Sequence, residues 1–79
     1  MDISKNLNGI YRTRNGKRVI NLQYVPTNYG GYKVTYPIKG SVVVREKPLK
    51  TCYTVWSIEG KYDVVTSPHE WDLIEELNP

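Results

Sequence analysis

The segment that most constrains this fold runs from Gly9 to Val25 and reads GIYRTRNGKRVINLQYV. Two runs rich in strand-forming residues flank the dipeptide Asn15-Gly16. This dipeptide is typical of a two-residue type I′ turn, because both central residues of that turn need a positive φ angle. The segment therefore predicts an antiparallel β-hairpin with Asn15 and Gly16 at its tip.

The register of this hairpin predicts two chemically different faces. A two-residue loop places Arg12 opposite Val19 and Tyr11 opposite Ile20, and successive side chains alternate between the two faces of a strand. The predicted core face consists of Tyr11, Ile20, Leu22 and Tyr24, and the predicted basic face consists of Arg12, Arg14, Lys17 and Asn21. We expect the basic face to meet water or a partner.

Composition extends the β prediction to the whole chain. Val, Ile, Thr, Tyr and Trp supply 30 of the 79 residues and alanine is absent, which favours strands over helices. We expect a single domain over residues 1–79, with residues 1–8 as a polar lead-in held by Ile3 and Leu7. One cysteine and one histidine are too few for an internal disulfide or a metal site, so no metal or cofactor is expected.

The middle of the chain predicts a loop and an interrupted strand. Residues 26–32 are dense in turn residues and predict a loop that exposes two tyrosines. Residues 33–44 predict an edge strand or a barrel corner. Pro37 cannot donate to a strand ladder there, and Gly40 indicates a bulge or a sharp bend.

A second hairpin is predicted from residues 51–58 and 61–65, around Glu59-Gly60. Its turn could be a two-residue loop or a glycine-bulge turn, and the two alternatives differ by one residue in register. Both predicted faces are apolar, which indicates a central strand. Cys52 is then expected to be a small buried residue in that strand.

The C-terminal segment 67–77 supports two predictions. Ser67 and Glu70 match a capping box with Pro68 at the first helical position, which predicts a short helix. A closing strand over residues 71–77 is the alternative.

Four motifs occur along residues 11–74 in a fixed order. They are Thr13-Arg14-Asn15-Gly16-Lys17-Arg18-Val19, Tyr36-Pro37-Ile38-Lys39-Gly40, Trp56-Ser57-Ile58-Glu59-Gly60-Lys61-Tyr62, and Ser67-Pro68 with Asp72-Leu73-Ile74. In these motifs the chain resembles a group of small phage and prophage proteins, mostly of unassigned function. The resemblance implies an all-β fold, a small SH3-like half-barrel of five or six antiparallel strands, with a closing strand favoured over a C-terminal helix. It implies no reaction.

Catalysis is not expected from this sequence. Ser67, His69 and Glu70 are close in sequence, but a nucleophile needs a base that a third group orients inside a pocket. Neighbouring positions on one strand or helix do not converge in that way. We expect a surface or capping role for His69, and a solvated edge at Glu70 and Asp72. The protein is therefore predicted to be non-enzymatic.

Charge is divided unevenly along the chain. Residues 1–50 contain ten Lys and Arg and two acids, whereas residues 51–79 contain one Lys and six acids. This asymmetry indicates either a nucleic-acid surface or strands of opposite charge paired in one sheet. The candidate contacts to a protein partner or to nucleic acid are Arg12, Arg14, Lys17, Arg18, Lys33, Tyr29 and Tyr32. The cations could neutralise phosphates, and the tyrosines could stack on unpaired bases.

The leading hypothesis is a phage-type accessory protein that binds a host protein, through an edge strand or a charged patch, and inhibits a host or defence protein. RNA or DNA binding is the alternative, and pairing of two copies through an edge strand is a further arrangement. Residues 1–8 lack the apolar centre of a signal peptide, and no apolar run could cross a membrane. The expected location is the cytoplasm, which for a phage protein is that of the host.

Overall fold

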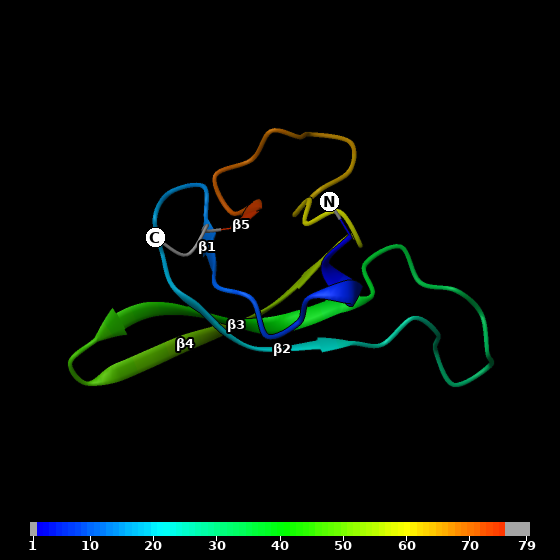
Figure 1. Ribbon diagram of the computed structural model, residues 1–79, viewed down its shortest axis with the longest axis horizontal. Helices are drawn as coiled ribbons and strands as arrows, with labels where there is room; N and C mark the ends of the chain where they lie inside the picture. Colours follow the sequence, from blue (N-terminus) through cyan, green and yellow to red (C-terminus); the bar gives the residue numbers. More distant parts are fainter. Residues whose placement is uncertain (1, 76–79) are drawn as a thin grey trace.

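The computed structural model describes residues 2–75, which form five strands and one short 3₁₀ helix (Figure 1). The elements are η1 (Ile3–Lys5), β1 (Tyr11–Thr13), β2 (Val19–Tyr24), β3 (Ile38–Glu46), β4 (Leu49–Trp56) and β5 (Leu73–Glu75). Every pair of neighbouring strands is antiparallel. The predicted all-β class is therefore confirmed.

The described strands form two sheets and no closed barrel. The larger sheet has the order β2-β3-β4, and the smaller sheet pairs β1 with β5. In Figure 1 the smaller sheet lies above the larger one, and residues 57–72 arch over the molecule between the end of β4 and β5. The predicted first hairpin is thus divided between the sheets, and β1 and β2 meet only at a bridge between Arg12 and Arg18.

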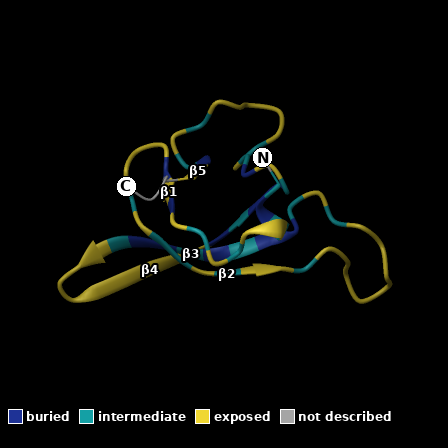
Figure 2. Cartoon of the chain, in the orientation of Figure 1, coloured by how far each residue is buried: buried dark blue, intermediate teal, exposed yellow. Residues whose placement is uncertain are grey.

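The core lies between the two sheets and draws on both ends of the described chain (Figure 2). Its buried members are Ile3, Tyr11, Ile38, Val42, Trp56 and Leu73. Ile3 also donates its N–H to the Ile58 carbonyl at 2.9 Å, and Leu7 packs against the core. The prediction that these two residues hold the N-terminal lead-in is confirmed.

The turn at Asn15-Gly16 is a glycine-bulge turn, so the predicted two-residue loop is wrong. Gly16 has a φ of 88°, while Asn15 is not among the residues with positive φ. The Thr13 N–H donates to the Lys17 carbonyl at 2.9 Å, and the Lys17 N–H donates back to the Thr13 hydroxyl at 2.9 Å. The threonine hydroxyl thereby stabilises a wider turn, and the register shifts by one residue.

The predicted core face of this hairpin is only partly correct. Tyr11 is buried and Ile20 and Leu22 are half-buried, but Tyr24 is exposed. The cause is a bulge in β2, where Asn21 has a φ of 58° and the register with β3 shifts. An extra residue in one strand turns the following side chains away from their expected face.

Gly40 lies opposite that bulge, in the middle of β3. A Cβ atom at Gly40 would lie 2.9 Å from Leu22 Cδ2 and 3.2 Å from the Ile20 carbonyl oxygen. The glycine is therefore needed because the bulged strand packs directly over it. The predicted irregularity is present, but on the partner strand, and β3 is the central strand rather than the predicted edge strand.

The prediction of a second hairpin is wrong, because its turn forms but its second strand does not. Residues 61–65 form no strand, and β4 is an edge strand of the larger sheet instead of a central one. Gly60 has a φ of 89°, so the glycine-bulge alternative describes the turn correctly. Cys52 is exposed, which contradicts its predicted burial. One face of β4 supplies Trp56 to the core, and residues 52–55 of the strand border a groove.

The C-terminal segment forms a strand, so the helix prediction is wrong. β5 pairs with β1 and places Leu73 opposite Thr13. The Arg14 N–H donates to the Asp72 carbonyl at 2.8 Å, and this contact continues the pairing past the end of the strands. Long-range pairing with β1 thus overrides the local capping signal. The predicted strand residues 76–77 lie outside the described residues.

Candidate functional site

A buried carboxylate, Asp72, organises the segment that forms one wall of the site. Its Oδ1 accepts the Tyr62 N–H at 2.8 Å, and its Oδ2 accepts the His69 N–H at 2.9 Å. The Arg14 guanidinium lies 3.5 Å from the same Oδ2. Asp72 therefore fastens both ends of the 62–69 loop and connects them to the first turn. The prediction that Asp72 belongs to a solvated edge is wrong.

The environment of Asp72 keeps it ionised. Burial tends to raise the pKa of this carboxyl, but the N–H donors of His69 and Tyr62 and the charge of Arg14 act in the opposite direction and prevail. The pKa of Asp72 therefore lies below its ordinary value. A charged carboxylate is the form that accepts these bonds most strongly.

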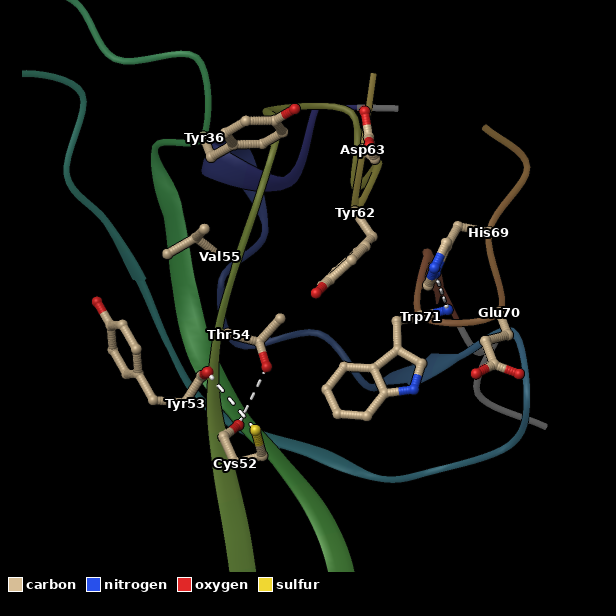
Figure 3. A pocket seen from close by; sticks show the side chains of 10 residues that line it. All are labelled: Tyr36, Cys52, Tyr53, Thr54, Val55, Tyr62, Asp63, His69, Glu70 and Trp71. Atoms are coloured by element: carbon tan, nitrogen blue, oxygen red, sulfur yellow. Dashed lines mark hydrogen bonds between the residues drawn. The ribbon is translucent and has the colours of Figure 1, made fainter. Parts of the chain in front are cut away.

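A groove of about 650 Å³ lies between β4 and this fastened segment (Figure 3). Its lining residues are Tyr36, Cys52, Tyr53, Thr54, Val55, Tyr62, Asp63, His69, Glu70 and Trp71. Four consecutive residues of β4 form one side, and Tyr62 with residues 69–71 forms the other. The groove therefore follows the edge of a sheet.

The far wall of the groove consists of aromatic rings that hold one another in place. Tyr62 stacks on His69 with a centroid separation of 4.5 Å and meets Trp71 edge to face at 5.9 Å. His69 Nδ1 accepts the Trp71 N–H at 3.1 Å. Tyr36 closes one end, where its hydroxyl accepts the Val64 N–H at 3.3 Å. These contacts preorganise an apolar surface with a fixed shape.

Hydrogen bonding in β3 determines which residues of β4 face the groove. The Val43 N–H donates to the Arg18 carbonyl at 2.8 Å, so the peptide groups of Val43 point from β3 towards β2. Peptide groups alternate sides along a strand, so those of Val42 and Gly40 point towards β4. Their register partners are therefore the residues of β4 that bond to β3.

These partners are Cys52 and Thr54, so the alternate residues Tyr53 and Val55 direct their N–H and C=O groups away from the sheet. No strand pairs with this edge of β4 within residues 2–75. The Cys52 thiol donates a weak hydrogen bond to the Tyr53 carbonyl oxygen, at 3.8 Å. The groove thus contains backbone groups that could pair with another extended chain.

Two carboxylates give the groove a negative charge. Asp63 and Glu70 both line it. The N–H of Val65 donates to Asp63 Oδ1 at 2.9 Å and is the main reason that the pKa of Asp63 lies below its ordinary value. The lowered pKa keeps Asp63 ionised near neutral pH, and the two acidic side chains favour a ligand that carries a positive charge.

Cys52 and His69 both line the groove but form no catalytic pair. The thiol contacts the Tyr53 carbonyl, and the imidazole stacks on Tyr62 and bonds to the Trp71 N–H. In Figure 3 the rings of Tyr62 and Trp71 come between the two side chains. Residues 2–75 also contain no group of three His, Cys, Asp or Glu residues that could hold a metal ion.

None of the seven residues predicted as contacts lines this groove. Arg14 pairs with Asp72, and Arg18 makes two hydrogen bonds to Glu46, at 3.2 and 3.1 Å. These bonds raise the pKa of Arg18 and lower that of Glu46. Arg12 donates to the Gly16 carbonyl at 3.4 Å, and Lys17 is half-buried. The predicted basic face is therefore interrupted by ion pairs.

The remaining predicted contacts lie in the loop between β2 and β3. Tyr29 and Tyr32 are exposed, as predicted. Asn28 shapes this loop, since its Oδ1 accepts the N–H groups of Gly30 and Tyr32 at 3.0 and 3.1 Å. Lys33 and Thr27 form an isolated antiparallel backbone bridge across the base of the loop. Of this loop, only Tyr36 lines the groove.

Sequence reasoning missed the groove because its residues were assigned to a paired hairpin. Tyr53 and Tyr62 belonged to the predicted hairpin with two apolar faces, whereas both are exposed. Asp72 gave no warning of its role, because an acid between the apolar residues Trp71 and Leu73 matches the alternation of a half-buried strand.

Comparison with protein-family models, with curated proteins and with solved structures found no match to this chain. Within residues 2–75, no helix is long and apolar enough to cross a membrane.

Proposed function

We propose that this protein acts by binding, and that it accepts an extended segment of a partner protein along the outer edge of β4. The observation that carries the proposal is the pair of outward-facing residues Tyr53 and Val55 at the side of a preformed groove. Strand addition of this kind obtains affinity from main-chain hydrogen bonds and specificity from side-chain pockets.

The chemistry of the groove defines the expected segment. The rings of Tyr62 and Trp71 offer a flat apolar surface on which aliphatic or proline side chains can pack. Asp63 and Glu70 favour a Lys or Arg in the same segment. The expected ligand is therefore an extended peptide that combines apolar residues with a basic one.

The mode of action is inhibition by occupancy, without chemistry. The resemblance to phage and prophage proteins makes a host protein the expected source of the segment. By covering a segment of the host protein, this protein would inhibit that host protein, and such a role needs no catalytic residues. Cys52 and His69, which the groove contains without pairing them, support a non-enzymatic role.

The proposal can be tested with a displayed library of random ten-residue peptides, followed by fluorescence polarisation on the selected sequences. Val55→Pro removes one outward N–H from the groove side of β4, and proline is tolerated on the open side of an edge strand. We expect a loss of affinity of about tenfold or more, which corresponds to about 1.4 kcal/mol.

Thr51→Pro is the matched control, because Thr51 lies on the same outer edge but does not line the groove. It should bind the selected peptides as the unaltered protein does. Equal binding by all three proteins, or a library that yields no binders, would contradict the proposal. If the protein forms a dimer and Val55→Pro dissociates it, the segment bound along β4 belongs to a second copy of this chain and not to a partner protein.

A further inference from the structure

The far end of the β3–β4 hairpin extends beyond the rest of the molecule. Figure 1 shows the two strands reaching past β2 and past the smaller sheet, and Figure 2 shows their connecting end as exposed. Residues 45–53 are all exposed, so neither face of this ribbon packs against the core. An element that contacts so little of its own protein is available to a partner.

The charge of this hairpin end is positive and largely unbalanced. Arg45, Lys47 and Lys50 make no side-chain hydrogen bond or ion pair within residues 2–75. The single acid of the hairpin end, Glu46, is already bound by Arg18, and the charge of Arg12 also acts on it. The three cations therefore face solvent without compensation from the described chain.

Two of these cations lie directly opposite each other. The register pairs Arg45 with Lys50 across the hairpin. Like charges at directly opposed positions destabilise an antiparallel pair. The hairpin end thus carries a repulsion that an anionic partner would relieve.

We propose that this hairpin end, Arg45 to Lys50, is a second binding site and that its ligand is double-stranded DNA. A two-stranded β-ribbon fits the major groove of B-form DNA, where flanking cations reach the phosphates. Residues 45–50 contain no aromatic ring for stacking on unpaired bases, and the major groove of A-form RNA is too narrow for side chains. Leu49, which is 58% exposed, supplies an apolar contact for a thymine methyl group.

This site differs from the basic face that the sequence predicted. Arg14 of that face pairs with Asp72, and Arg18, which was also a predicted contact, pairs with Glu46. The uncompensated charge lies instead on Arg45, Lys47 and Lys50, which are not among the predicted contacts. The site is also separate from the peptide groove, because no residue of 45–50 lines that groove.

The test is fluorescence anisotropy with a labelled 20-base-pair DNA duplex between 50 and 200 mM salt. Three phosphate contacts predict a log–log salt slope of about −2.7, which is about a 40-fold loss of affinity over that range. The double variant Lys47→Ser/Lys50→Ser should reduce the slope to about −0.9. Lys33→Ser/Lys39→Ser is the control, because it removes the same net charge from residues outside the hairpin end.

Lys50→Glu is a second variant that distinguishes a loss of binding charge from a loss of folding. It replaces a repulsive pair with an attractive one beside Arg45, so the variant should fold and still lose most of its DNA affinity. Val55→Pro should bind DNA unchanged, which separates this proposal from the one on the groove.

Three outcomes would overturn the proposal. Equal losses in the hairpin variant and its control would mean that only net charge matters. Tighter binding to single-stranded RNA than to the duplex would exclude the ribbon-in-groove geometry. Equally tight binding to polyglutamate would point to an acidic protein surface as the ligand.

Discussion

Two turns of this molecule have the same local structure and lead to different outcomes. Residues 13–17 (TRNGK) and 57–61 (SIEGK) each begin with a buried hydroxyl residue and place a glycine of positive φ at the fourth position. In each, the first N–H donates to the lysine carbonyl at 2.9 Å, and the lysine N–H donates back to the hydroxyl, at 2.9 Å in one turn and 3.0 Å in the other.

The chain takes a different course after each of the two turns. After the first turn it enters the six-residue strand β2, which pairs with β3 on both sides of its bulge. After the second turn the chain leaves the sheet at Tyr62, because its N–H donates to Asp72 rather than to β4. A turn sequence therefore specifies the turn, while the partners available to the next residues decide whether a hairpin forms.

Removal of Asp72 should have the largest effect on stability, and it should affect the second turn far more than the first. Asp72→Ala leaves the partly buried N–H groups of Tyr62 and His69 without their acceptor, and each such loss costs about 1–3 kcal/mol where water cannot replace it. We expect a decrease of about 3 kcal/mol in the free energy of unfolding, measured by urea denaturation. Hydrogen exchange should quicken at Tyr62 far more than at Lys17.

Glu46→Ala is the control for that variant, because it removes an ion pair whose two partners are exposed. Its effect should be small beside that of Asp72→Ala, because solvent screens an exposed ion pair. A similar loss in both variants would mean that Asp72 does not hold the second turn apart from β4.

The same carboxylate predicts how stability depends on pH. The pKa of Asp72 is lower in the folded protein than its ordinary value, so its contribution to stability is present above about pH 4 and is lost as the pH falls through the folded value. Urea midpoints of the unaltered protein should decrease below about pH 4. Asp72→Asn should show a shallower decrease, with the remainder due to Asp63 and Glu46; an unchanged slope would contradict this assignment.

Alanine at either turn glycine should have the next largest effect. Gly16 and Gly60 both have positive φ angles near 90°, which a Cβ atom disfavours whatever space surrounds it. Gly16→Ala and Gly60→Ala should each lower the free energy of unfolding by about 1–2 kcal/mol. Asn substitutions should be milder, because asparagine tolerates this region. A negligible effect at only one position would show that the turns are less alike than their bonds indicate.

The turn hydroxyls should have the smallest effect of the set. Thr13→Val and Ser57→Ala each remove the acceptor for the N–H of the lysine four residues later. Each should cost about 1 kcal/mol in thermal or urea unfolding. Thr51→Val is a control on an exposed strand position and should change stability little.

The elements predicted well are those whose cause is local. Asn15-Gly16 and Glu59-Gly60 each indicated a turn because glycine alone adopts the required φ without strain, and both turns are present. The exposure of Tyr29 and Tyr32 followed from a loop that is dense in turn residues. Gly40 indicated an irregularity, and the structure has one opposite it, in β2.

The elements predicted poorly depend on residues distant in sequence. Asp72 draws Tyr62 out of the predicted second hairpin, and that leaves β4 as an edge strand with Cys52 exposed. Thr13 lies opposite Leu73 rather than in a continuous first hairpin. No local pattern encodes these pairings, so the groove along β4 could not be located from the sequence.

The pairing of β1 with β5 also has a consequence for synthesis of the chain. β2, β3 and β4 follow one another and can assemble as soon as they leave the ribosome, whereas β1 must wait for a strand made at the opposite end of the described chain. Contacts between such distant residues form late, since a long loop must first close. Asp72 is adjacent to β5, so the aromatic wall of the groove is completed only at that stage. We expect a nascent chain to present the basic hairpin end early and to acquire the peptide groove only at the end of folding.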